Sequence, residues 1–208
     1  KFQAEKSLWS QPVTDGTTLF VSALDHNLYA INPKDGSKIW ATNLGGAVVY
    51  APSLSADNST LYVTTLANEV LALNAKDGAI IWRKPYQTSL WSQPVIMGEN
   101  LIFGDLSGNV YAIAAKDNAN VWSVPVNDPV AGKPTVVGDM VYIPTENGKL
   151  VALRADGSLA WMKTFDGKLY NGPVEMGDKL LVGVVGGKYP LYMITNQNAD
   201  VWQFAPAK

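Results

Sequence analysis

Five tryptophans recur at nearly constant intervals along this chain of 208 residues. They are Trp40, Trp82, Trp122, Trp161 and Trp202, and the intervals are 42, 40, 39 and 41 residues. Five prolines keep the same period: Pro12, Pro52, Pro94, Pro134 and Pro173. A period near 40 is typical of propeller blades and of solenoids. We therefore interpret residues 1–208 as a single domain of five repeats, which span approximately residues 8–44, 45–86, 87–126, 127–165 and 166–205.

Each repeat predicts four short strands. The second is a short apolar run, as in Leu19–Val21, and the third ends in a run such as Asn27–Ile31 before a turn and the tryptophan strand. Continuous apolar runs require burial on both faces of a sheet, which stacked blades provide. Asp-Gly between two such runs favours a hairpin. No segment shows a helical period. The pattern predicts an all-β fold, a five-bladed β-propeller of four-stranded antiparallel blades, over a helical solenoid or a β-sandwich.

The segments Ala30–Trp40 and Ala72–Trp82 carry a resemblance to the tryptophan-docking repeat of the PQQ-like (BamB-like) β-propellers. The resemblance extends over all five repeats. It implies that each tryptophan packs on the neighbouring blade, with a small alanine leaving room for the ring. The fifth repeat departs from the pattern, because Met193 replaces the alanine and Gln197-Asn198 replaces Asp-Gly. We therefore expect Trp202 to dock differently.

The family includes quinoprotein dehydrogenases, the lipoprotein of the outer-membrane β-barrel assembly machinery and extracytoplasmic sensor domains. The resemblance implies an extracytoplasmic location: periplasmic, cell-surface or secreted. The dehydrogenases are longer and hold a metal and a quinone with acidic and basic groups, often beside adjacent cysteines. None of that constellation maps onto this sequence, so a quinoprotein-like oxidoreductase fragment is the third-ranked interpretation.

Closure of the array is a separate question. Five units are enough for a ring, since propellers contain about 4 to 8 blades. An open array would expose apolar sheet faces, which favours closure of the five blades into a monomeric ring. The degenerate fifth repeat suggests that the array ends near Lys208, and Phe2–Lys6 would then add an outer strand at the seam. The alternative is a fragment of a larger ring.

The composition argues against several functions. Sixteen basic and eighteen acidic residues give a net charge of −2 without a long run of either sign, so we expect no nucleic-acid partner. No run approaches the ~18 apolar residues of a membrane span, and we expect no direct membrane insertion.

The chain lacks cysteine, and its one histidine, His26, lies in a turn-like segment. The repeated turn aspartates Asp35, Asp77, Asp117 and Asp156 are expected to be structural.

No nucleophile elbow or paired histidine is present in the sequence. We therefore expect no enzyme activity, no catalytic residue, no metal site and no cofactor.

Variable residues precede each repeated proline. Because first strands line the central channel of propellers, we expect these residues at its mouth. The candidate binding surface contains Trp9, Gln11, Tyr50, Trp91, Gln93, Lys133, Tyr170 and Asn171. Aromatic rings beside amides and a lysine form a surface that binds peptides or sugars. The alternative is that these rings only pack blade against blade.

The sequence thus predicts a non-enzymatic interaction or scaffold module that binds a protein or peptide. The alternative is a module that binds a small molecule or glycan at the aromatic mouth. A protein partner would use a broad loop face, with Asp25, Glu69, Asp105 and Glu146, whereas a small ligand would use a concave pocket lined by Trp9, Trp91 and Tyr170.

Overall fold

A computed structural model describes residues 2–205, which form an all-β fold of five four-stranded antiparallel sheets and one two-stranded parallel sheet. We call the four-stranded sheets blades 1 to 5. Their strands are β1 (Val13–Thr14), β2 (Leu19–Ser22), β3 (Asn27–Ile31) and β4 (Lys38–Asn43); β5 (Ser53–Leu54), β6 (Thr60–Thr65), β7 (Glu69–Asn74) and β8 (Ile80–Pro85); β10 (Val95–Met97), β11 (Asn100–Gly104), β12 (Asn109–Ala114) and β13 (Asn120–Pro125); β15 (Thr135–Val137), β16 (Met140–Pro144), β17 (Lys149–Arg154) and β18 (Leu159–Thr164); and β19 (Val174–Met176), β20 (Lys179–Gly183), β21 (Leu191–Thr195) and β22 (Asp200–Phe204). The parallel sheet pairs β9 (Trp91–Ser92) with β14 (Ala131–Gly132). The predicted second, third and tryptophan strands are confirmed.

Turn chemistry forms the outer hairpins. In blade 1, Gly36 adopts a φ of 73°, and the Asp35 carboxylate accepts a hydrogen bond from the Ser37 amide at 2.9 Å. In every blade the strand register shifts one residue after the position opposite the docking tryptophan, as between Ala30 and Ile31. That opposite position is the repeated alanine in four blades and Met193 in blade 5. The small side chain therefore lies directly across the strand pair from the indole.

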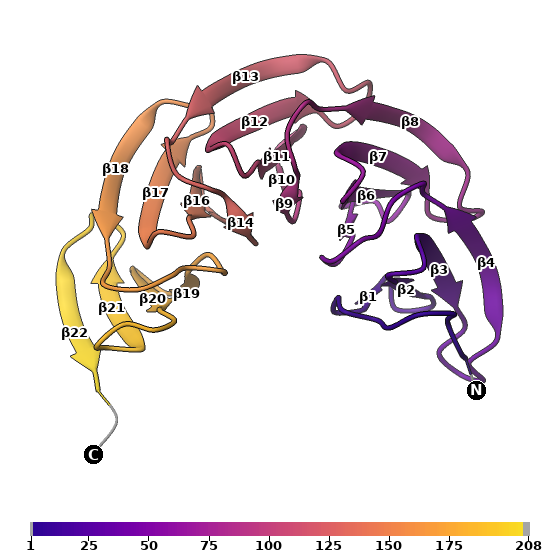
Figure 1. The fold of residues 1–208 in the computed structure, drawn as a ribbon, viewed down its shortest axis with the longest axis horizontal. Coiled ribbons are helices and arrows are strands. Elements are labelled where there is room, and N and C mark those ends of the chain that lie inside the picture. The colour runs from indigo at the N-terminus through magenta and orange to yellow at the C-terminus, as the bar shows by residue number, and fades with distance from the viewer. Residues whose placement is uncertain (1, 206–208) are drawn as a thin grey trace.

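The blades form an open arc (Figure 1). The first strands lie along the concave inner side, the fourth strands lie along the convex side, and the two ends of the chain are at opposite ends of the arc (Figure 1). The predicted closed ring is therefore wrong, because five blades at this inclination do not complete a turn. No strand forms over Phe2–Lys6, so the predicted seam strand is wrong as well; Phe2 instead packs on Tyr29, with the ring centroids 4.9 Å apart.

The core is divided among the junctions between blades. Four clusters of buried side chains each join two consecutive blades. Leu90, for example, lies in one cluster with Val70 of blade 2 and Phe103 of blade 3. A fifth cluster, around Val21 and Tyr29, belongs to blade 1 and is covered by Phe2 and Ala4. Most apolar burial therefore depends on a neighbouring blade. No helix long and apolar enough to cross a membrane is found in residues 2–205.

Candidate functional site

The residues that precede the repeated prolines lie along the inner side of the arc, and we call segments 9–11, 49–51, 91–93, 131–133 and 170–172 the inner rim. The sequence predicted that these residues belong to the first strands of the blades. That prediction is wrong. Those strands begin after the proline, as β10 does at Val95, because proline has no amide hydrogen to donate to a strand ladder. The inner rim is instead the connection between one blade and the next.

Backbone hydrogen bonds join the inner rim across blades 3, 4 and 5. Strands β9 and β14 run parallel, and Lys133 forms a parallel bridge with Asn171. The Lys133 amide donates to the Tyr170 carbonyl at 3.1 Å. Gly132 is required here, because a Cβ atom at this position would lie 2.3 Å from the Tyr170 carbonyl oxygen. This half of the rim is therefore a continuous, closely packed backbone ladder.

Side-chain hydroxyls hold parts of the inner rim in the first three blades. Ser22 Oγ donates to the Tyr50 carbonyl at 3.1 Å, and Thr64 Oγ1 donates to the Ser92 carbonyl at 2.7 Å. Both hydroxyls end or nearly end a second strand, so the blade core positions the rim. The sequence analysis did not single out Ser22 and Thr64. Both are hydroxyl residues near the end of an apolar second strand, and that shared position could have identified them.

The structure separates the predicted site residues into exposed and buried groups. Trp9 is 67% exposed and Trp91 is 38% exposed, although both belong to the pentapeptide Leu-Trp-Ser-Gln-Pro. Gln11, Lys133 and Asn171 are exposed, and Tyr50 and Tyr170 are partly buried. Gln93 is buried, so its assignment to the exposed binding surface is corrected; its backbone N–H donates to the Gly132 carbonyl.

One feature brings predicted residues together. Lys133 and Asn171 line one open cleft of about 480 Å³ between blades 3, 4 and 5, together with Pro134, Pro173 and Glu175. Burial raises the pKa of the Tyr50 hydroxyl, and the Tyr170 hydroxyl raises it further. No aromatic contact joins Trp9 to Trp91 in residues 2–205.

The other large grooves lie beside docking tryptophans. Similar grooves of about 580, 490 and 470 Å³ accompany Trp82, Trp161 and Trp40. Since the same groove recurs at three of the four junctions, the repeat architecture explains it without a ligand.

Four docking tryptophans make the same contact. Each indole N–H donates to a carbonyl in the outer hairpin of the next blade: Trp40 to Ala75 at 3.1 Å, Trp82 to Ala115 at 3.2 Å, Trp122 to Ala155 at 2.9 Å and Trp161 to Asn196 at 2.9 Å. In blades 2 and 4 the hairpin glycine lies against the ring: a Cβ on Gly78 would be 2.6 Å from Trp40 Cε3, and one on Gly157 would be 2.8 Å from Trp122 Cδ2. Packing of the tryptophan on the neighbouring blade is confirmed in these four repeats.

The predicted loop face is built largely from carboxylates that have internal partners. Asp105 is fully buried and accepts hydrogen bonds from Thr88, Tyr111 and the Asn109 amide. Burial alone would raise the pKa of Asp105, but these hydrogen bonds outweigh it and hold the pKa below 3.8.

The other loop-face acids are also paired. Asp25 accepts from the Tyr29 hydroxyl at 2.7 Å, Glu69 pairs with Arg83 at 3.1 Å, and Glu146 pairs with Lys168 at 2.7 Å. Because the Asp105 side chain is fully buried, its assignment to a protein-binding face is wrong.

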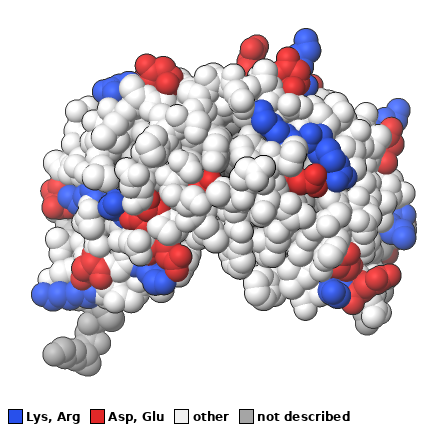
Figure 2. Space-filling model, turned by 45° about the horizontal axis from the view of Figure 1, so that its top comes forward, with Lys and Arg blue, Asp and Glu red and all other residues white. Residues whose placement is uncertain are grey.

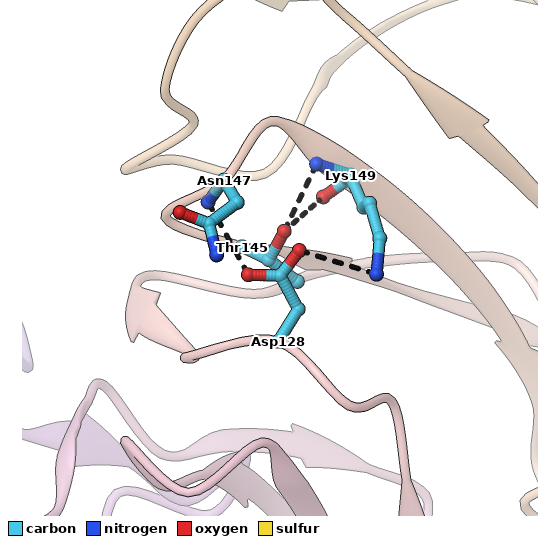
Figure 3. Close-up of polar contacts among 4 residues, drawn as sticks. All are labelled: Asp128, Thr145, Asn147 and Lys149. Carbon is cyan, nitrogen blue, oxygen red and sulfur yellow. Dashed lines mark hydrogen bonds and ion pairs between the residues drawn. The ribbon is translucent and has the colours of Figure 1, made fainter.

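Blade 4 uses the same polar pair with the positions exchanged (Figure 3). Asp128, in the connection that corresponds to Thr88, lies beside Thr145, which corresponds to Asp105. Asp128 is 3.4 Å from Lys149 Nζ and accepts from the Asn147 amide at 3.3 Å, and Thr145 Oγ1 accepts from the Lys149 amide at 2.9 Å. Blades 3 and 4 therefore each place one acid and one hydroxyl here, and an alignment of these two repeats would have revealed the exchange.

Charge is mixed on the face that Figure 2 shows. Lysine and arginine alternate with acidic side chains around a large uncharged area, and neither sign dominates (Figure 2). His26 adopts a φ of 71°, which fits the turn role expected for it. In residues 2–205 no group of three or more His, Asp or Glu side chains has the arrangement of a metal site.

Stacked four-stranded sheets joined by tryptophan docks define a β-propeller-like repeat protein. The profile of the family described as outer membrane protein assembly factor BamB matches residues 2–117 and again residues 106–205. The chain therefore belongs to this PQQ-like, BamB-like family. A search of curated proteins finds no significant match.

Solved structures share the fold at low sequence identity. BamB from Moraxella catarrhalis superposes with a TM-score of 0.73 at 16% identity, over 99% of this chain and 78% of that one. Quinohemoprotein alcohol dehydrogenase from Comamonas testosteroni superposes with a TM-score of 0.81 at 14% identity, over 98% of this chain and 43% of that one. Both matches show the blade architecture, and neither shows a complete propeller of five blades.

Proposed function

We propose that this chain is a non-enzymatic interaction module whose five blades hold the inner rim as a binding surface for a protein or peptide. The observation that carries the proposal is the exposure of Trp9 and Trp91 on the inner rim, whose backbone at Trp91 is fixed by hydrogen bonds. Large aromatic side chains are the commonest anchors of protein interfaces. An exposed indole on a rigid support loses little conformational entropy on binding, which favours affinity.

Family membership supports this assignment. The family profile is described as an outer membrane protein assembly factor, so a protein partner and an extracytoplasmic location are the proposals that follow from it. The quinohemoprotein neighbour shows only the fold at 14% identity, and an oxidoreductase activity has no observation in its favour here.

A second candidate is binding of a small molecule or glycan in the cleft between blades 3, 4 and 5. Lys133 and Asn171 offer hydrogen-bond donors there, beside the two prolines of the cleft. The cleft is open, so it would leave much of a small ligand exposed, and we rank this candidate below a peptide partner.

The experiment compares the protein with the double variant Trp9→Ala/Trp91→Ala in a selection of displayed random peptides and on a glycan array. We expect peptides enriched by the unaltered protein to bind the double variant roughly 30-fold more weakly, the equivalent of ~2 kcal/mol at an anchor site. The matched control is Ile81→Ala/Val121→Ala, which removes exposed apolar side chains from the outer strands.

Three results would count against the proposal. Peptides could bind the double variant as well as the unaltered protein, or the control could lose binding equally. A large drop in the melting temperature of the double variant would instead assign Trp9 and Trp91 to the core. Enrichment of glycans whose binding depends on Lys133 would favour the second candidate.

A further inference from the structure

The junction between blades 3 and 4 lacks a polar link that the other three junctions carry. At those three junctions, the residue two positions after the docking tryptophan donates to a carbonyl in the outer hairpin of the next blade. The donors are Thr42 Oγ1 to Gly78 at 2.7 Å, Lys84 Nζ to Asn118 at 2.6 Å and Lys163 Nζ to Asn198 at 3.5 Å. In blade 3 the corresponding residue is Val124, whose side chain has no hydrogen to donate.

The residue that faces this link from the next blade changes in the same way. It stands two positions before the next docking tryptophan, and at two junctions it accepts from the lysine. Asn120 Oδ1 accepts from Lys84 at 2.6 Å, and Asp200 Oδ1 lies 3.0 Å from Lys163 Nζ. In blade 4 the same position is Leu159. Both members of the polar pair are therefore aliphatic between blades 3 and 4.

An open apolar groove of about 340 Å³ lies at this junction, and we call it the junction groove. Its lining consists of Val124–Asn127, Val151, Leu153, Gly157, Leu159 and Met162. Among the described residues no charged side chain lines it, whereas charged side chains line the grooves beside Trp40, Trp82 and Trp161. Leu159 and Met162 are 57% and 47% exposed, so the aliphatic pair does not close the groove. Blades 3 and 4 both have a neighbour on each side, so this exposure belongs to the junction itself.

One residue of the junction groove has a backbone acceptor without a side-chain donor. The Gly157 carbonyl is the counterpart of those that Thr42, Lys84 and Lys163 reach, and within residues 2–205 no side chain donates to it. A lysine ammonium here would lose water without an amide or carboxylate to replace it, which is costly. The junction between blades 1 and 2 uses a neutral donor instead, since Thr42 donates there and the aliphatic residue is Ile80. The groove therefore matches an uncharged apolar group that carries one hydrogen-bond donor.

The strand beside the junction groove is open to strand addition. Strand β13 is the outermost strand of blade 3, so within residues 2–205 its outer edge pairs with no other strand (Figure 1). Charged side chains protect such edges, and β4, β8, β18 and β22 each carry at least one. Strand β13 carries none. An extended segment that pairs with a free edge directs alternate side chains to one side, where pockets select them.

We propose that the junction groove and the free edge of β13 form a second peptide site, which takes an extended, uncharged segment. The segment lies along β13, one branched aliphatic side chain fills the groove, and one N–H donates to the Gly157 carbonyl. The volume of about 340 Å³ is near the lower limit of ligand pockets, roughly 300–1,000 Å³, which fits a single side chain better than a larger molecule. The site lies on the convex side of the arc, away from the inner rim (Figure 1).

Methionine methyl resonances test the proposal with the full chain. Protein labelled with ¹³C in these methyl groups is titrated with the acetylated, amidated peptide Thr-Leu-Thr-Leu-Thr. We expect a saturable shift of the Met162 signal and no shift of the Met176 signal, which reports an equally exposed methionine on β19. The same peptide with both leucine nitrogens methylated has lost those N–H donors, and it should bind roughly 10-fold more weakly.

Three variants locate the binding. Val124→Lys/Leu159→Asn installs the polar pair found between blades 2 and 3, and it should abolish the shift. Ile81→Lys, which adds the same charge at an exposed position of β8, is the matched control and should bind like the unaltered protein. Trp9→Ala/Trp91→Ala should also bind unchanged, so the inner-rim proposal and this one can fail separately.

Melting temperatures verify that the variants are folded. The proposal would be overturned by a Met162 signal that does not move or by equal binding of the methylated peptide. It would also be overturned if folded Val124→Lys/Leu159→Asn retained the shift. Loss of the shift in Trp9→Ala/Trp91→Ala would place the peptide on the inner rim instead.

Discussion

The docking tryptophans differ in what they contribute, because their surroundings differ. Trp82 packs on blade 3 and donates to Ala115, whereas Trp202 is 44% exposed. We expect Trp82→Ala to lower the free energy of unfolding by about 3–5 kcal/mol, as for other large-to-small core substitutions. Trp202→Ala should cost about 1 kcal/mol or less, because nearly half of this side chain is already exposed. Denaturant titrations measure both, and equal losses would show that Trp202 is as well packed as Trp82.

Asp105 makes a pH-dependent contribution to stability. Its pKa is held below 3.8 by hydrogen bonds that outweigh the effect of burial. A group with a lowered folded-state pKa stabilises the protein above its unfolded pKa, and that contribution is lost as pH falls through the folded-state value.

Asp105→Asn should therefore lower the free energy of unfolding at pH 7 by about 1.5–3 kcal/mol, the range for hydrogen bonds to a charged group. The difference from the unaltered protein should shrink near pH 3. Denaturation at both pH values measures it, with the exposed turn variant Asp117→Asn as control. A difference that stays constant between the two pH values would contradict this account of the carboxylate.

At the level of single elements, the ends of the second strands differ between blade 3, where the next connection crosses the strand, and blade 5. Gly104 ends β11 against Val130, and Gly183 ends β20 with open space beside it. Gly104→Ala should destabilise the protein by about 1–3 kcal/mol through overpacking, and Gly183→Ala should be nearly neutral in the monomer. Thermal unfolding of the two variants compares them. Similar losses would mean that alanine acts through the strand itself and not through the junction.

The strands were predictable from the sequence, but the roles of several residues were not. The alternation of apolar runs with Asp-Gly turns is local chemistry, and it located the second, third and tryptophan strands of every blade. Exposure depends on neighbours that the local sequence does not contain. Trp9 and Trp91 share one pentapeptide and differ in exposure, and Gln93 is buried where Gln11 is exposed, because blade 2 precedes only the second pentapeptide.

For the whole molecule, the period predicted the blades but not the closure. Spacings near 40 residues fix the size of a repeat, whereas the inclination between sheets depends on side-chain packing at each junction. The open arc leaves both end blades without one neighbour (Figure 1).

The open arc is tested most directly by two distances between spin labels. The chain lacks cysteine, so labels can be placed singly in the outer hairpins at Lys34 of blade 1, Lys76 of blade 2 and Gln197 of blade 5. Pulsed electron resonance on labelled protein diluted with unlabelled protein would then compare the pair Lys34/Lys76, on adjacent blades, with the pair Lys34/Gln197. The structure predicts a clearly longer distance for Lys34/Gln197. Equal distances for the two pairs would place blades 1 and 5 side by side and contradict the open arc.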